Sequence, residues 1–106
     1  MINDAFIKGF KKNIYIINTA RGKCLDTAAL VESIKSGKVL GACLDVLEFE
    51  SDSFEGFEEN QLPESMKYLI HSDKVILSPH IAGWTQESNF KMSELIAIKM
   101  LSVLKI

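Results

Sequence analysis

The chain has 106 residues, of which 47% are apolar and 25% charged, and its formal net charge is −2. This length suits one globular domain, and the slight acidity argues against a nucleic-acid or anionic-membrane surface, because such binders concentrate Lys and Arg. No apolar run approaches the roughly 20 residues of a membrane span, and the N-terminus lacks the pattern of a secretion signal, so we expect a cytoplasmic protein.

The first half of the chain predicts two helices, each followed by a strand. Asn3 is placed to cap a short helix that ends near residues 11–13. Residues 14–18 are β-branched and aromatic without alternation, which is typical of a strand covered on both faces. Asp26 caps a second helix, Gly37 follows it at the left-handed C′ position, and residues 39–46 predict a second buried strand. The apolar stripe of the second helix consists of Ala29, Leu30, Val31 and Ile34.

The second half begins with a long acidic segment, residues 47–74, in which seven carboxylates lie between Glu48 and Glu64 together with three phenylalanines. It predicts a short helix at residues 64–70, after Pro63, and loops of this length are usually functional or disordered. Residues 75–78 predict a third strand. Thr85 then caps a final helix with a broad apolar face.

Strands separated by helix-length connections imply an α/β fold with parallel pairing and right-handed crossovers. Three buried strands are few for such a sheet, and the first strand should have a further neighbour that no predicted strand of this chain supplies. The cysteines Cys24 and Cys43 lack Cys-x-x-Cys spacing and a nearby His. We therefore expect them to be small buried hydrophobes, with neither a disulfide nor a metal site.

Polar side chains stand at or just beyond the end of each predicted strand. Arg21 follows the first strand, Asp45 ends the second, Glu50 lies five residues later, and His80 follows the third. Because the carboxyl ends of parallel strands line up on one edge of a sheet, where ligands bind, these side chains should converge on one site.

Each of these residues also has an ordinary structural explanation. The guanidinium of Arg21 offers a fork that matches a carboxylate or α-keto acid, or it caps loop carbonyls at the surface. His80 could transfer a proton in alcohol–ketone interconversion, with Glu50 holding its tautomer, or the two could be a structural histidine and a solvated charge. Asp45, at the end of a buried strand, needs a partner, for which a ligand amide is a good candidate.

The combination of segments resembles one family over almost the whole chain. It is similar to the C-terminal part of the nucleotide-binding domain of the D-isomer-specific 2-hydroxyacid dehydrogenases, which include phosphoglycerate, glycerate, formate and D-lactate dehydrogenases. The resemblance implies a partial Rossmann-like three-layer sandwich, with three parallel strands and flanking helices. It is carried by Ile17-Asn18-Thr19-Ala20-Arg21-Gly22, by residues 26–30 and 36–42, by Leu44-Asp45-Val46 through Glu50, and by Ser78-Pro79-His80-Ile81-Ala82-Gly83-Trp84-Thr85.

The resemblance also implies roles for individual residues. Arg21 would bind and polarise the carboxylate and carbonyl of a small 2-hydroxy or 2-keto acid, His80 would be the acid/base, and Glu50 would be its partner. Asp45 would bind the carboxamide of the nicotinamide. The implied cofactor is NAD, with NADP left open, and the implied cofactor-binding residues are Thr19, Ala20, Arg21, Asp45, His80, Ala82 and Gly83.

The sequence departs from the family in lacking a Gly-x-Gly-x-x-Gly segment and a substrate domain. We therefore expect residues 1–106 to be the C-terminal part of a Rossmann NAD-binding domain, a fragment with little or no activity on its own. The alternative is a non-catalytic half-domain that self-associates or binds a partner, because the final helix carries more apolar positions than three strands can cover. Both hypotheses predict a homo-oligomer such as a dimer, and neither involves nucleic acid, a membrane or a metal.

Overall fold

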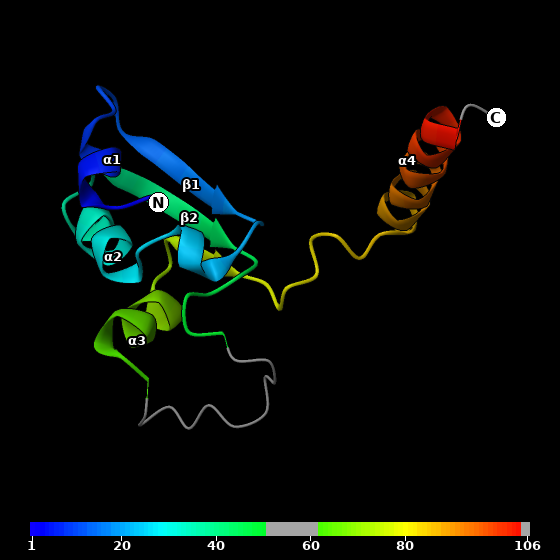
Figure 1. Ribbon diagram of the computed structural model, residues 1–106. Helices are drawn as coiled ribbons and strands as arrows, with labels where there is room; N and C mark the ends of the chain where they lie inside the picture. The colour runs from blue at the N-terminus through cyan, green and yellow to red at the C-terminus, as the bar shows by residue number, and fades with distance from the viewer. Residues whose placement is uncertain (51–61, 105–106) are drawn as a thin grey trace.

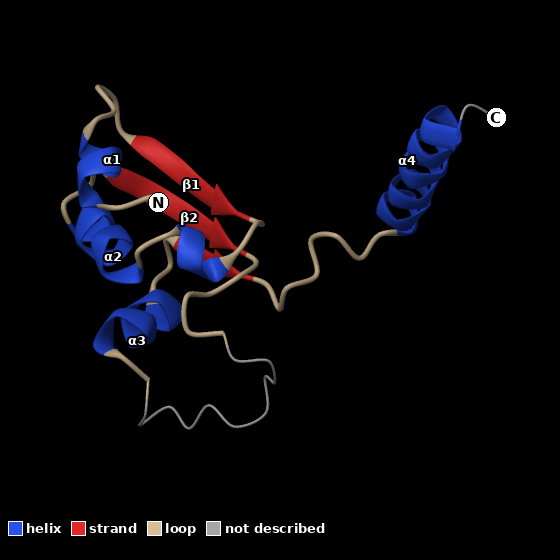
Figure 2. Ribbon diagram, in the orientation of Figure 1, coloured by secondary structure: helices blue, strands red, loops and turns tan. Residues whose placement is uncertain are grey.

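The computed structural model describes residues 1–50 and 62–104. Three parallel strands form one sheet, and helices precede, connect and follow them (Figure 1; Figure 2). In chain order the elements are α1 (Asp4–Lys8), β1 (Ile14–Asn18), the 3₁₀ helix η1 (Gly22–Cys24), α2 (Thr27–Lys35), β2 (Val39–Leu44), α3 (Glu64–His71), β3 (Val75–Leu77) and α4 (Gln86–Leu104).

The predicted caps determine where three of the helices begin. The side chains of Asn3 and Asp26 accept hydrogen bonds from Phe6 N and Ala29 N at 3.0 and 2.9 Å, which satisfies amides that helix geometry leaves unpaired. Thr85 accepts from Ser88 N at 3.0 Å and caps α4 in the same way. Gly37 follows α2 with a φ of 78°, the left-handed conformation that the sequence predicts.

The sheet has the order β1-β2-β3, and both strand pairs are parallel, as predicted. Ile16 pairs with Ala42, and Ala42 pairs with Val75, so the middle strand is β2. The helices α2 and α3 lie on the crossover connections between successive strands. All three strands therefore end at the same edge of the sheet.

The core lies between the sheet and helices α1, α2 and α3, all on one face of the sheet. Residues from the helices and from β1 and β2 form a single buried apolar cluster. Its members are Ile7, Ile16, Leu25, Leu30, Val31, Ile34, Val39, Ala42, Leu44, Met66 and Leu69. One continuous layer of apolar contacts thus holds the strand ends in place.

The opposite face of the sheet is uncovered in the described part of the chain. Tyr15 and Ile17 of β1 are exposed, as are Leu40 of β2 and Ile76 of β3. The prediction that residues 14–18 are covered on both faces is therefore wrong for Tyr15 and Ile17, and the predicted burial of the second and third strands is wrong for Leu40 and Ile76. The physical reason is that both crossovers have the same hand and run along the same direction of the sheet, so α2 and α3 share one face.

Helix α4 lies apart from the sheet and from the other helices (Figure 1), and none of its residues is buried. Its apolar side chains, which the sequence predicted as a broad face, are exposed; they include Phe90, Leu95, Ile96, Met100, Leu101 and Leu104. Among the described residues, no helix combines the length and hydropathy that crossing a membrane requires. Part of the acidic segment, residues 51–61, lies outside the described residues.

Neighbouring isoleucines of β1 provide a test of this one-sided core. Ile16 is 7% exposed and Ile17 is 73% exposed. We expect Ile16→Ala to lower the free energy of unfolding by about 2–5 kcal/mol through lost burial and a residual cavity, while Ile17→Ala changes it by about 0.5 kcal/mol or less. Urea denaturation followed by circular dichroism measures both values, and equal losses for the two variants would contradict the described packing.

Candidate active site at the carboxyl edge of the sheet

The chain segments that leave the three strands are joined to one another by backbone hydrogen bonds. Asp45 N donates to Asn18 O at 3.0 Å, which links the ends of β2 and β1. Ser78 N donates to Leu44 O at 3.0 Å, which links the ends of β3 and β2. The segments that carry Arg21, Asp45 and His80 therefore begin side by side at one edge, as the sequence predicts.

Arg21 lies in a short loop that Asn18 shapes from the end of β1. The Asn18 side chain accepts from Ala20 N and donates to Arg21 O, both at 3.1 Å. The Arg21 side chain is exposed, and its Nη1 donates to Ala20 O at 2.7 Å. The guanidinium thus caps one loop carbonyl, while its remaining N–H donors leave capacity for an anionic ligand.

The closest pair of expected catalytic side chains is Glu50 and His80. Glu50 Oε1 lies 2.8 Å from His80 Nδ1, although the residues are thirty positions apart in sequence. Their side chains are 16% and 42% exposed, so the pair is half-buried with the imidazole still accessible. A carboxylate at this distance favours a proton on Nδ1 and leaves Nε2 as the nitrogen for proton exchange.

Asp45 is 5% exposed and has three hydrogen-bond partners within the chain. Its Oδ1 accepts from Ser78 Oγ at 2.6 Å and from Ile81 N at 2.9 Å, and its Oδ2 accepts from Ala82 N at 2.9 Å. The bond from Ser78 is the main cause that lowers the pKa of Asp45 below its ordinary 3.8, against the opposing effect of burial. The partners that the buried carboxylate of Asp45 needs are thus supplied by Ser78, Ile81 and Ala82 of the same chain. Its Oδ2 can accept one more hydrogen bond, for example from an amide.

His80 has a left-handed backbone, with a φ of 56°. Non-glycine residues seldom adopt this conformation, although His is among those enriched in it. It costs about 1–3 kcal/mol and persists only where surrounding contacts impose it. Such a conformation at a residue of the site indicates that the loop is held in place.

Two residues that the sequence analysis did not assign fix the loop that carries Glu50. A Cβ on Gly22 would lie 1.8 Å from Leu47 O, so the backbones of the two loops touch only because residue 22 is glycine. Glu48 Oε2 accepts from Thr27 N at 2.9 Å, at the start of α2. The position of Gly22 directly after Arg21 was the available signal, whereas Glu48 is indistinguishable from its acidic neighbours.

Asn18 and Ser78 are the other two unassigned residues of this edge. Both are polar residues at the end of an apolar run, and this was the sequence signal that could have identified them. Asn18 is buried and Ser78 is half-buried, and each bonds to a segment that carries an expected site residue.

The remaining expected cofactor residues are at the surface of the same edge. Thr19 and Ala20 follow β1, Ala82 and Gly83 follow β3, and all four are exposed. A Cβ on Gly83 would meet nothing within 4 Å, so open space adjoins it. The described residues contain no cluster of potential metal ligands, and Cys24 and Cys43 are half-buried free thiols.

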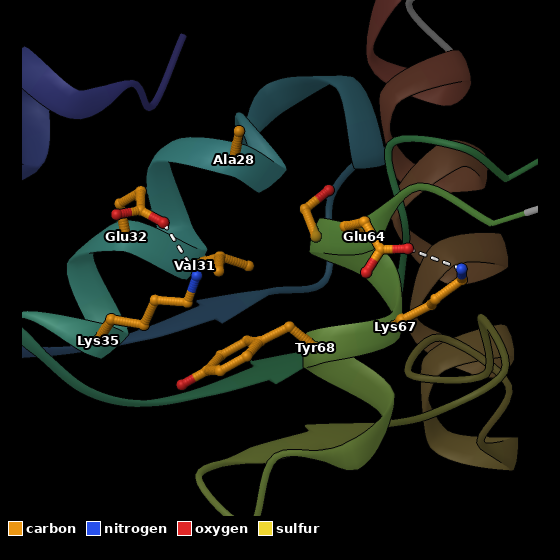
Figure 3. Close-up of a pocket in the computed structure, with 8 residues that line it drawn as sticks. Ala28, Val31, Glu32, Lys35, Glu64, Lys67 and Tyr68 are labelled. Atoms are coloured by element: carbon orange, nitrogen blue, oxygen red, sulfur yellow. Dashed lines mark hydrogen bonds and ion pairs between the residues drawn. The ribbon is translucent and has the colours of Figure 1, made fainter.

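A separate hollow of about 460 Å³ lies between α2 and α3 (Figure 3). Lys35 Nζ lies 5.2 Å from the centre of the Tyr68 ring across it, and Lys67 pairs with Glu64 at 2.7 Å on the rim. None of the expected site residues lines this hollow. The charged side chains that line it form ion pairs within α2 and within α3. We therefore interpret the hollow as a groove between two packed helices.

A parallel α/β sheet with polar residues gathered at its carboxyl edge is the arrangement in which open α/β folds bind their ligands. The sequence profile of the family described as "D-isomer specific 2-hydroxyacid dehydrogenase, NAD binding domain" matches residues 1–82. The chain belongs to this family, and the predicted three parallel strands with flanking helices are confirmed.

Individual relatives agree with this assignment. The chain is 42% identical over 105 residues to a glyoxylate reductase of Thermofilum pendens, covering 99% of this chain and 28% of that protein. It is 36% identical over 88 residues to a D-lactate dehydrogenase of Treponema pallidum, covering 81% of this chain and 27% of that protein. The NAD-complexed structure of a D-isomer specific 2-hydroxyacid dehydrogenase from Lactobacillus delbrueckii ssp. bulgaricus aligns with a TM-score of 0.72 and 36% identity, covering 99% of this chain and 33% of that one. The chain thus spans a third or less of the length of these relatives.

The contact between Gly22 and Leu47 yields a prediction about the site. Gly22→Ala forces the two loops apart, and we expect it to lower the free energy of unfolding by about 1–3 kcal/mol, the usual cost of overpacking. It should also weaken the NMR contacts between the side chains of Glu50 and His80. Gly83→Ala is the matched control, because its added methyl group meets open space. Equal stability of the two variants would contradict the close approach.

The lowered pKa of Asp45 predicts a pH dependence of stability. A carboxyl group whose pKa is lower in the folded state stabilises the fold above its ordinary pKa, and this stabilisation is lost as the pH falls through the folded-state value. Asp45→Asn should therefore be less stable than the parent chain at neutral pH. The difference in the free energy of unfolding should be largest there and should decrease as the pH falls below 3.8. Urea denaturation across this range measures it, with Asp73→Asn, an exposed turn residue, as control. A difference that does not change with pH would refute the assignment.

Proposed function

We propose that this chain contributes the catalytic edge of an NAD-dependent oxidoreductase, which transfers hydride between nicotinamide and C2 of a D-2-hydroxy or 2-keto acid. The observation that carries the proposal is the Glu50–His80 pair, 2.8 Å apart, at the sheet edge that also bears Arg21. A histidine oriented by a carboxylate is suited to exchange a proton with a hydroxyl or carbonyl oxygen near neutral pH.

The side chains of the proposed site have complementary tasks. The accessible guanidinium of Arg21 binds the substrate carboxylate through two parallel hydrogen bonds and polarises the adjacent carbonyl. His80 delivers a proton from Nε2 to the carbonyl oxygen during reduction and accepts it back during oxidation. Glu50 keeps the other ring nitrogen protonated, so that Nε2 remains available for the transfer.

The residues at this edge fit the nicotinamide end of NAD. Asp45 Oδ2 has one hydrogen bond and can accept another from a carboxamide N–H. Exposed backbone at Thr19, Ala20, Ala82 and Gly83 would border the ring. When bound, NAD(H) accepts or supplies the hydride, while the protein provides geometry and charge. NADP is the alternative cofactor, because the chain lacks the residues that read the ribose.

We further propose that residues 1–106 are the C-terminal part of a Rossmann NAD-binding domain in a cytoplasmic enzyme. The matching relatives are about three to four times as long, and no glycine-rich phosphate loop occurs in this sequence. The chain alone should therefore bind cofactor weakly and have little or no activity. Glyoxylate and D-lactate, after which two of the relatives are named, are the first substrates to test.

The second candidate function is a non-catalytic half-domain that associates with another chain. The specific support is the exposed apolar surface on α4 and on the open face of the sheet, because surfaces of this kind usually mark association. On either proposal we expect a homo-oligomer such as a dimer. The two candidates differ in whether the chain binds a nicotinamide cofactor.

Titration with NADH, followed by its fluorescence, tests the proposed function. We expect saturable binding in the range of about 1 mM, equivalent to about −4 kcal/mol. Gly83→Leu fills the open space beside the expected nicotinamide position and should weaken binding about tenfold or more, by about 1.4 kcal/mol. Ala28→Leu adds the same side chain to the exposed surface of α2 and should bind NADH normally.

Two outcomes of this titration would count against the cofactor site. The absence of saturation at millimolar NADH favours the half-domain without catalytic function. Equal affinity for the parent chain and Gly83→Leu would place the binding elsewhere on the molecule.

A further inference from the structure

The loop that carries His80 has little apolar packing to hold it. Pro79, Ile81, Ala82 and Gly83 are all exposed, and His80 itself has the left-handed backbone described above. A left-handed residue in an exposed loop relaxes to commoner conformations unless hydrogen bonds prevent it. The position of the imidazole therefore depends on the polar contacts of this loop.

These contacts converge on one buried carboxylate. Asp45 accepts from Ser78 on the N-terminal side of His80 and from Ile81 and Ala82 on its C-terminal side. The loop is thus held at both ends, with His80 between the two points of attachment. A buried carboxylate with three donors is a strong anchor, because charge-assisted hydrogen bonds are shorter and stronger than neutral ones.

Ser78 holds a special position in this arrangement, because it contacts three parts of the site at once. Its N–H donates to Leu44 O at 3.0 Å, at the end of β2, and its carbonyl accepts from His80 N, also at 3.0 Å. Its hydroxyl supplies the 2.6 Å bond to Asp45 Oδ1, the shortest of the three to this carboxylate. The hydroxyl therefore orients the carboxylate toward Ile81 N, which shares the same oxygen.

We propose that Ser78 is a positioning residue, whose hydroxyl orients the Asp45 carboxylate so that it clamps the loop on both sides of His80 and keeps the imidazole against Glu50. The inference rests on the proposed role of His80 in proton transfer, which gives the position of the ring its importance. Without the hydroxyl, Asp45 keeps its two backbone donors but loses the contact that fixes its rotation, and the loop gains freedom at its N-terminal end.

The test is NMR spectroscopy of the whole 106-residue chain, without cofactor or substrate. Three substitutions are compared with the parent chain. Ser78→Ala removes the hydroxyl, and Ser78→Thr keeps it. Ser93→Ala removes a serine hydroxyl that donates to Asn89 O within α4, and it serves as the control.

The two readouts are the hydrogen-exchange rates of the Ile81 and Ala82 amides and the imidazole ¹⁵N shifts of His80. For Ser78→Ala we expect exchange at these amides to be about tenfold faster or more, while amides of α2 keep their protection. We also expect its His80 ¹⁵N shifts to move away from the Nδ1-protonated form that Glu50 favours. Ser78→Thr and Ser93→Ala should match the parent in both readouts.

Unchanged exchange and unchanged ¹⁵N shifts in Ser78→Ala would overturn the proposal. Faster exchange with unchanged ¹⁵N shifts would overturn it as well, because Ser78 would then act on the loop without positioning the ring. The result is independent of the proposed function, since NADH binding is measured separately. If the chain fails to bind NADH but shows the expected NMR changes, the dehydrogenase role is refuted, whereas the positioning role of Ser78 is supported.

Discussion

The hydrogen bonds to the Asp45 carboxylate are the interaction on which the site depends. Parallel pairing brings the ends of β2 and β3 together, but it does not determine the path of the chain beyond them. The carboxylate, buried at the end of β2, takes two backbone amides and one hydroxyl from the segment after β3. Because a buried charge without partners is costly, this segment and the carboxylate stabilise each other. The left-handed conformation of His80 is acceptable within that mutual arrangement.

A second set of contacts orders the other half of the site. The chain after β1 turns through Asn18, whose amide group bonds to Ala20 and Arg21. The chain after β2 passes directly against Gly22 and is bonded through Glu48 to the start of α2. Each of these contacts involves the backbone of a loop, so they position the loops without using the proposed catalytic side chains themselves. Rigid support of this kind is what a preorganised site requires.

Much of the fold and part of the site could be predicted from sequence. Local signals located the strand at residues 14–18, the caps at Asn3, Asp26 and Thr85, and the alignment of Arg21, Asp45 and His80 at one edge. The contacts of Ser78 and Glu48 could not be predicted, because they depend on side-chain directions set only by tertiary packing. The exposure of Tyr15 and Ile17 could not be predicted either, because an apolar run in the sequence does not show which face of the strand is covered. Catalytic and cofactor roles for the site residues stay predictions.

The close approach at Gly22 has a mechanical consequence. With no side-chain atoms between them at this point, the backbones of the loop bearing Arg21 and the loop leading to Glu50 lie in direct contact. A ligand that pulled on the guanidinium would transmit its displacement across this junction to the carboxylate that orients the imidazole. Binding of a substrate carboxylate at Arg21 would thereby be coupled to the orientation of the imidazole of His80. The coupling would depend on Gly22, which has a hydrogen atom where any other residue has a side chain.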